Sequence, residues 1–212
     1  LCKWFAKKIG FNDSSGGIAA SGGTLSNLNA LIAARNNAGL GTDPNSVLLV
    51  SEDAHSSFIK CIRIMGLEAK NLVKIKTDNQ GRMDINNLRK SMNNCLLENK
   101  KIIAIVATLG TTVRGAIDPI KEISEICKDK DIWLHIDGSI GGIFAVTTIP
   151  IDGLNNINQA NSITINPQKI IGITKTSSLL LVSNINTLTN TFSTGLPYIS
   201  SKKNILNRGE IG

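Results

Sequence analysis

The sequence predicts an α/β fold, with a mostly parallel central sheet and helices on both of its faces. Short apolar, β-branched runs alternate along the chain with amphipathic segments, which is typical of βαβ units. Several of these runs end abruptly in polar residues, as strands do where their carboxyl ends border a ligand site. The 212 residues are 42% hydrophobic, which is enough apolar material for a buried core.

Four segments carry apolar residues at the three- and four-residue spacing of an amphipathic helix. Gly39 follows the first segment as a stop signal, and Asp84 precedes the third as a candidate N-cap. Pro119 stands at the start of the fourth, where a helix needs no N–H donor. We expect helices over residues 24–37, 56–65, 88–96 and 119–127.

Six apolar runs predict buried strands, because a strand covered on both faces is continuously apolar. The tail of the chain, residues 200–212, is instead polar and aperiodic, which fits a disordered terminus or the start of a mobile active-site loop. Since the chain also begins without Met, we expect a fragment truncated on both sides, with residues 1–198 forming a large domain and residues 199–212 beginning the loop. The predicted strands cover residues 47–50, 72–75, 102–107, 132–136, 162–165 and 178–182.

Composition argues against several classes of protein. The net charge is +7, but the basic residues are scattered and form no stripe with interleaved aromatics, so we expect no nucleic-acid partner. No apolar run approaches the length of a membrane span, and the first ten residues lack the apolar region of a signal peptide. The four cysteines are widely spaced and only two histidines accompany them, so we expect no metal site, reduced thiols and a cytoplasmic location.

Asp137 and Lys169 are the two residues on which the functional interpretation depends. Each follows an apolar run, at the edge of the sheet where α/β proteins bind ligands. A lysine and a carboxylate in this position suit pyridoxal 5'-phosphate (PLP), whose aldehyde forms a Schiff base with the lysine while the carboxylate pairs with the pyridine nitrogen. Asp137 could instead cap a helix at residues 141–142, and Lys175 is a competing candidate for the Schiff base.

A glycine-rich segment at residues 14–26 runs directly into the first predicted helix. Glycines allow backbone N–H groups to approach an anion, and the helix dipole adds positive potential. The segment lacks the lysine of a P-loop and does not match GxGxxG, and such a turn can simply connect two elements. We interpret it as a phosphate site formed by the backbones of Gly22, Gly23 and Thr24.

Three further polar groups follow predicted strands, each with two interpretations. His55 could stack on a flat aromatic ring or make a backbone contact at a helix start, and the sequence does not favour either. The hydroxyls of Thr108, Thr111 and Thr112 could bond the phenolic oxygen of a pyridine cofactor, although threonines in turns are commoner. Asp118 could orient a neighbour or cap the helix after Pro119, and we favour the cap.

The order of these signals, with these residues, strongly resembles the group II PLP-dependent amino-acid decarboxylases, which include glutamate, aromatic amino-acid and 2,4-diaminobutyrate decarboxylases. The resemblance covers residues 16–198 and rests on a specific combination of motifs: SGGTLSNLNALIAARN, SEDAHSSFIKCIRIMGL, VATLGTTVRGAIDPI, WLHIDGSIGG and NPQK. It implies the large domain of a fold-type I PLP enzyme. It also implies a homodimer with an amino-acid substrate, and a small C-terminal domain beyond this chain.

The resemblance also assigns roles to individual residues. It implies that Lys169 forms the Schiff base, that Asp137 pairs with the pyridine nitrogen, and that His55 and Ser139 lie against opposite faces of the ring. It places Thr112 near the cofactor. The phosphate would be held by Gly23, Thr24 and Asn166, with help from Gln168.

The chain departs from the family pattern at three places. Gln168 precedes the lysine where many relatives have His, and Gly138-Ser139-Ile140 follows the aspartate where many have Ala-Ala or Ala-Tyr. The loop tyrosine that returns a proton to the substrate carbon has no match, because Tyr198 lies too early.

We therefore expect PLP-dependent decarboxylation of an L-amino acid, with glutamate, aspartate, diaminobutyrate and aromatic substrates all open. Two alternatives remain: another fold-type I PLP enzyme, such as an aminotransferase or lyase, and a non-catalytic fragment or paralogue.

Overall fold

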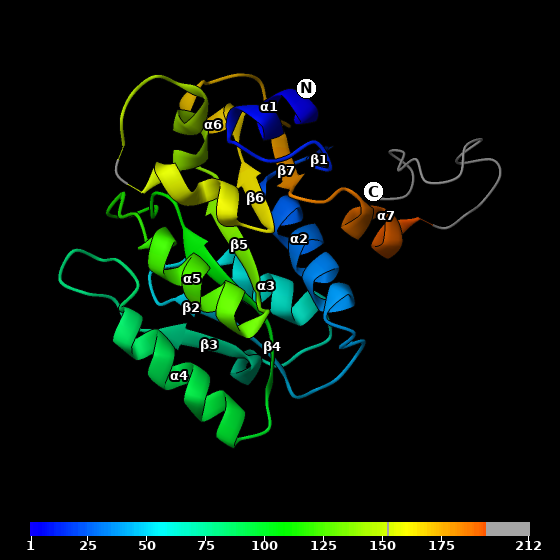
Figure 1. Cartoon of the computed structure of the whole chain (residues 1–212), viewed down its shortest axis with the longest axis vertical. Coiled ribbons are helices and arrows are strands. Elements are labelled where there is room, and N and C mark those ends of the chain that lie inside the picture. Colours follow the sequence, from blue (N-terminus) through cyan, green and yellow to red (C-terminus); the bar gives the residue numbers. More distant parts are fainter. Residues whose placement is uncertain (152, 194–212) are drawn as a thin grey trace.

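A seven-stranded sheet organises the computed structural model, which describes residues 1–151 and 153–193 (Figure 1). The strand order is β1-β7-β6-β5-β4-β2-β3. Neighbouring strands are parallel except for β7, which runs antiparallel to both β1 and β6. The strands are β1 (Gly16–Ala20), β2 (Ser46–Ser51), β3 (Leu72–Ile75), β4 (Lys101–Thr108), β5 (Trp133–Gly138), β6 (Ser162–Ile165) and β7 (Ser178–Val182).

Helices cover both faces of this sheet, as the sequence predicts. One face packs against α1, α4 and α5, and the other packs against α2, α3 and α7 (Figure 1). The helices are α1 (Cys2–Lys8), α2 (Gly23–Asn37), α3 (Ser57–Ile64), α4 (Ile85–Leu97), α5 (Ile120–Lys130), α6 (Pro167–Ile170) and α7 (Asn186–Phe192), with short 3₁₀ turns η1 (Ala69–Asn71), η2 (Gly141–Val146) and η3 (Leu154–Gln159).

The two covered faces explain why the inner strands are continuously apolar. In β2, Val47 and Leu49 join the cluster on the α4 and α5 face, while Leu48 and Val50 join the cluster on the α2 and α3 face. All four side chains are almost completely buried. Burial of successive residues on opposite faces removes the polar alternation of a half-exposed strand.

Most of the predicted elements are confirmed. Three strands have the predicted bounds, and the other three differ from them by one or two residues at each end. The sequence missed α1, α6, α7 and the edge strand β1, whose glycines we had interpreted as part of a turn. Glycine is required there because a Cβ at Gly17 would lie 2.3 Å from the carbonyl oxygen of Leu180 in the neighbouring strand.

Asp118 corrects our expectation that it caps the helix after Pro119. That helix, α5, begins at Ile120 and no side chain caps it. The buried Asp118 carboxylate instead accepts hydrogen bonds from the backbone N–H groups of Met83 and Thr108, both at 2.7 Å. Burial raises the pKa of Asp118 to about 6, and the two backbone hydrogen bonds oppose that rise. Asp118 therefore fastens the end of β4 to the segment that precedes α4.

Two further expectations concern the end of the chain and the absence of a membrane span. Tyr198 and the loop expected at residues 199–212 lie outside the described residues, and the proposed domain boundary stays a prediction. In residues 1–151 and 153–193, no helix is both long enough and apolar enough to cross a bilayer.

The two acceptor roles of Asp118 predict a large effect of Asp118→Asn on stability. Asparagine keeps one acceptor oxygen, so one buried backbone N–H would face an NH₂ group, and we expect the free energy of unfolding to fall by about 1–3 kcal/mol. Urea denaturation measures this change.

Asp84→Asn is the matched control. Asp84 caps α4 through a single bond from the backbone N–H of Asn87, and asparagine caps helices about as well as aspartate. Equal losses in the two variants would contradict the role assigned to Asp118.

Candidate active site

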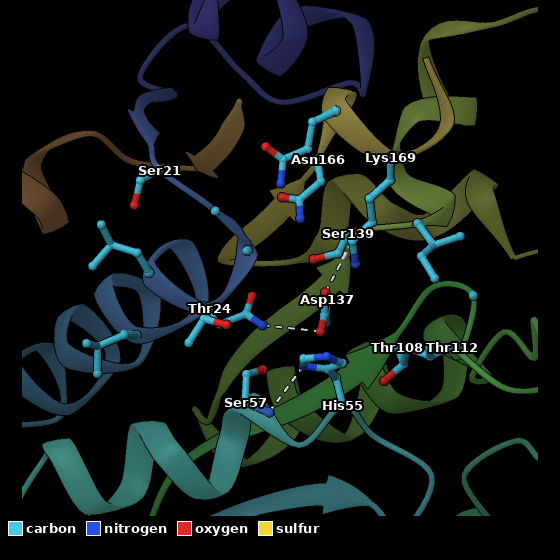
Figure 2. A pocket seen from close by; sticks show the side chains of 18 of the residues that line it. Ser21, Thr24, His55, Ser57, Thr108, Thr112, Asp137, Ser139, Asn166 and Lys169 are labelled. Atoms are coloured by element: carbon cyan, nitrogen blue, oxygen red, sulfur yellow. Dashed lines mark hydrogen bonds between the residues drawn. The ribbon is translucent and has the colours of Figure 1, made fainter. Parts of the chain in front are cut away.

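A pocket of about 510 Å³ lies where β1, β2, β4, β5 and β6 end. Because these strands point the same way, the polar residues that follow them meet at one edge of the sheet. The lining includes all ten residues predicted to bind the cofactor: Gly22, Gly23, Thr24, His55, Thr112, Asp137, Ser139, Asn166, Gln168 and Lys169. Figure 2 shows Asn166 and Lys169 on one side of Asp137 and His55 on the other.

The N-terminus of α2 forms one wall of the pocket. The first N–H groups of a helix have no partner within it. Here the N-cap is Gly22, which has no side chain that could accept from them. The first turn contains no acidic residue. A helix terminus with free donors and no competing carboxylate is suited to binding an anion such as a phosphate.

Gly23 allows this helix terminus to approach two other site residues closely. A Cβ at Gly23 would lie 2.7 Å from Nδ2 of Asn166 and 2.7 Å from Oγ of Ser139. The amide of Asn166 is itself oriented, because the Ser178 hydroxyl donates to its Oδ1 at 2.5 Å and thereby leaves Nδ2 as the group nearest Gly23. The glycine thus creates a cradle of donor groups from two separate segments.

Asp137 lies at the end of β5 and is 4% exposed. Its Oδ1 accepts from the backbone N–H of Ser139 at 3.1 Å, and its Oδ2 accepts from Nδ2 of Asn27 at 3.2 Å. It does not cap the following turn, since η2 begins at Gly141 with Ile140 as its N-cap. Among the described residues, no lysine or arginine forms an ion pair with this buried carboxylate.

His55 fits both interpretations that the sequence left open. Its Nδ1 accepts a hydrogen bond from the backbone N–H of Ser57 at 3.1 Å, drawn as a dashed line in Figure 2, and its ring also lines the pocket. The backbone contact fixes the ring that faces the pocket. Ser57 and Thr108 add two buried hydroxyls that line the pocket without a hydrogen-bond partner among the described residues.

Lys169 lies on α6, a four-residue helix whose N-cap is Asn166. The side-chain oxygen of Gln168 accepts from the backbone N–H of Ser177 at 2.8 Å, which ties this short helix to the start of β7. Both lysines are exposed, but Lys169 borders the pocket and the competing Lys175 does not. The structure therefore favours Lys169 over Lys175 as the lysine of the site.

Two buried residues of the site were missed by the sequence analysis. Asn27 contacts Asp137 directly, and His135 contacts Asn27 through Nε2 at 3.1 Å and the hydroxyl of Ser162 through Nδ1 at 2.8 Å. Asn27 could have been found, because it lies four residues before Leu31 and therefore on the buried face of the helix. His135 lies inside an apolar run, where the sequence gives no sign of its partners.

His135 is completely buried, and burial lowers its pKa to about 4. The negative charge of Asp137 and a hydrogen bond to the backbone of Ser162 favour the charged ring and oppose this change, but they are the smaller effects. The imidazole is therefore neutral near pH 7.

A sheet-end pocket that joins a helix N-terminus, a buried carboxylate and a lysine defines the class of PLP-binding domains with fold type I. The model of the pyridoxal-dependent decarboxylase conserved domain matches residues 1–208, and the chain belongs to this family. The chain is 33% identical to an aromatic-L-amino-acid decarboxylase of Bacillus atrophaeus, over 99% of its own length and 44% of that protein's.

Two further relatives agree with the family and the fold. An L-aspartate decarboxylase of Metarhizium robertsii is 32% identical, over 85% of this chain and 38% of that protein. The crystal structure of mouse CSAD superposes with a TM-score of 0.86 at 28% identity, over 91% of this chain and 42% of that one. The chain thus spans less than half the length of these relatives, and the expected fold class is confirmed.

Gly23→Ala tests the close approach of α2 to Asn166 and Ser139. The added methyl group has to displace these neighbours, and overpacking of this kind costs about 1–3 kcal/mol, so we expect PLP to bind roughly tenfold or more weakly. A titration with PLP, followed by its visible absorbance, measures the change. Gly22→Ala adds a Cβ with nothing within 4 Å, in extended backbone, and should weaken binding less; the reverse order would contradict the cradle.

The neutral burial of His135 predicts a pH-dependent contribution to stability. Between pH 4 and pH 6.5 the unfolded chain protonates this histidine and the folded chain does not, so its contribution is complete above pH 6.5 and is lost as the pH falls to 4. That difference in pKa, at about 1.4 kcal/mol per pH unit, amounts to about 3 kcal/mol. The measurement is the free energy of unfolding of wild type minus that of His135→Gln. This difference should rise as the pH increases from 4 to 6.5. A difference that stays constant over this range would show that His135 is protonated in the folded chain.

Proposed function

We propose that the protein carrying this chain converts an L-amino acid to the corresponding amine and CO₂ with PLP as its cofactor. The single observation that carries this proposal is the pocket in which Asp137 and Lys169 meet the N-terminus of α2. The three groups suit the three recognisable parts of PLP, which are a pyridine nitrogen, an aldehyde and a phosphate.

The residues present fit this cofactor by a test that is independent of the comparisons. A buried carboxylate without a cationic partner is costly, and the protonated nitrogen of a pyridine would supply that partner to Asp137. A Cβ at Gly23 would fill the cradle beside Asn166 and Ser139, so the missing side chain leaves that space to a ligand group. The hydroxyls of Ser57 and Thr108, which have no hydrogen-bond partner in the part of the chain that the structure describes, offer further polar contacts to a molecule in the pocket.

Each residue has a separate task in the proposed reaction. When bound, PLP supplies the electron sink that accepts the electron pair released as CO₂ departs. Lys169 would hold the cofactor through its aldehyde. Asp137 would accept a hydrogen bond from the pyridine N–H and keep that nitrogen protonated, while His55, fixed by the backbone of Ser57, presents its ring to the pocket.

The substrate, the assembly and the cellular location are parts of the same proposal. The two curated relatives are named for an aromatic amino acid and for L-aspartate, so the family supports an amino-acid substrate without selecting one. We propose a homodimer by resemblance to the family. Four free cysteines in the described residues support a reducing, cytoplasmic environment.

Borohydride reduction of the protein with PLP, followed by peptide mapping, tests the proposed role of Lys169. We expect one phosphopyridoxyl adduct, on Lys169, and its loss in Lys169→Ala together with amine production. Lys175→Ala is the matched control and should keep both the adduct and CO₂ release, because its side chain lies outside the pocket.

Other outcomes would count against the proposal in distinct ways. An adduct on Lys175, or adducts scattered over surface lysines, would show that the pocket does not bind PLP as proposed. Formation of a ketoacid without release of CO₂ would instead retain the cofactor site and replace decarboxylation by transamination.

A further inference from the structure

A continuous path of hydrogen bonds connects the interior of the sheet to Asp137. Nε1 of Trp133 donates to Oγ of Ser162 at 2.8 Å, and the same hydroxyl lies 2.8 Å from Nδ1 of His135. Nε2 of His135 lies 3.1 Å from Oδ1 of Asn27, whose Nδ2 donates to Asp137 at 3.2 Å. All five residues are buried, from 0% to 6% exposed.

The groups at the two ends of this path determine which atom donates in every hydrogen bond along it. The Asp137 carboxylate only accepts, so the amide of Asn27 must present its NH₂ group to Asp137 and its oxygen to His135. His135 must then carry its proton on Nε2, and a neutral ring leaves Nδ1 as an acceptor. The indole of Trp133 only donates, so the hydroxyl of Ser162 accepts from it and gives its own proton to Nδ1.

We propose that Asn27, His135 and Ser162 are positioning residues, whose one-directional chain of hydrogen bonds from Trp133 holds the Asn27 amide against Asp137 and fixes the orientation of that carboxylate. If the Asn27 amide were flipped, its oxygen would face the carboxylate of Asp137, and its NH₂ group would face the N–H at Nε2 of His135. Both contacts would be lost, so the amide is held in one orientation. The outer lone pairs of Asp137 are consequently left for a donor in the pocket. The effect on PLP rests on the proposed function, whereas the chain of hydrogen bonds does not.

The titratable groups around this path do not disturb its direction. The neighbouring Cys61 of α3 has its thiol pKa raised to about 12, mainly by burial and further by the negative charge of Asp137, so it stays protonated. His55 and Lys169 line the pocket, and among the described residues neither forms a hydrogen bond with Asn27 or His135. Because the ring of His135 is uncharged, the carboxylate of Asp137 is the one charged group of the path.

Nitrogen NMR of the chain labelled at its histidine rings tests the direction without any cofactor. The chain has two histidines, so the spectrum holds two sets of ring signals, and His135→Gln assigns them. We expect His135 to be neutral at pH 7 and protonated on Nε2. A proton on Nδ1, or a charged ring at pH 7, would overturn the proposal.

PLP affinity tests whether the path positions Asp137. Asn27→Leu removes the donor to the carboxylate, and loss of a hydrogen bond to a charged group should weaken PLP binding roughly tenfold or more. Asn29→Leu is the matched control, because Asn29 is a buried asparagine on the same helix, outside the pocket, whose Nδ2 has no hydrogen-bond partner in the described residues. Equal affinities in the two variants would overturn the positioning role.

Asn27→Asp adds a readout that a purely structural role would not change. The new carboxyl has the shape of the amide and can donate to Asp137 only while it is protonated. We expect PLP affinity relative to wild type to fall as the pH rises, and a ratio that is constant with pH would count against the proposal. This variant also serves if Asn27→Leu does not fold, as judged by circular dichroism.

The two proposals fail in distinguishable ways. If the wild-type chain does not bind PLP, the proposed function fails, and the NMR result alone decides whether the hydrogen-bond path exists as described. If wild type binds PLP and Asn27→Leu binds as tightly as Asn29→Leu, the function stands and the positioning role is wrong.

Discussion

The buried carboxylate of Asp137 is the group around which the site has to be arranged. Burying a charge costs free energy unless each oxygen finds donors, and here one donor comes from the turn after β5 and one from α2. The contact with Asn27 therefore fixes α2 against the end of β5. Gly23 lies one helical turn before Asn27, about 6 Å along the axis. One helix thereby sets the spacing between the carboxylate and the anion-binding cradle.

The sequence predicted those parts of the fold and site that depend on local pattern. Strands buried on both faces are continuously apolar, so residues 162–165 and 178–182 were recognisable without knowledge of their neighbours. The ten candidate cofactor residues met in one pocket because polar groups that follow parallel strands share one sheet edge. The parts that were missed depend on partners distant in sequence, as His135 does on Asn27, or on close backbone contact, as the glycines of β1 do.

Asp118 and Lys169 show two ways in which sequence spacing leaves a choice open. A carboxylate before Pro119 looks like a cap, but the donors that it accepts from include Met83, 35 residues earlier. Lys169 and Lys175 both follow the strand β6, and spacing alone does not separate them. The hydrogen bond from the backbone N–H of Ser177 to the side chain of Gln168 closes the segment between α6 and β7 into a loop. Within this arrangement Lys169 borders the pocket and Lys175 does not.

The place of β1 in the sheet has a consequence for the order of folding. β1 lies at the edge, and its strand neighbour is β7, so Gly16 pairs with Val182 across most of the chain. Closing a loop of this length has an entropic cost that is recovered only after the strands between have formed. The segment that leads from β1 into α2 leaves the ribosome well before β7 does. Its strand pairing nevertheless has to wait until β7 has been synthesised, so the anion-binding turn is completed late in folding.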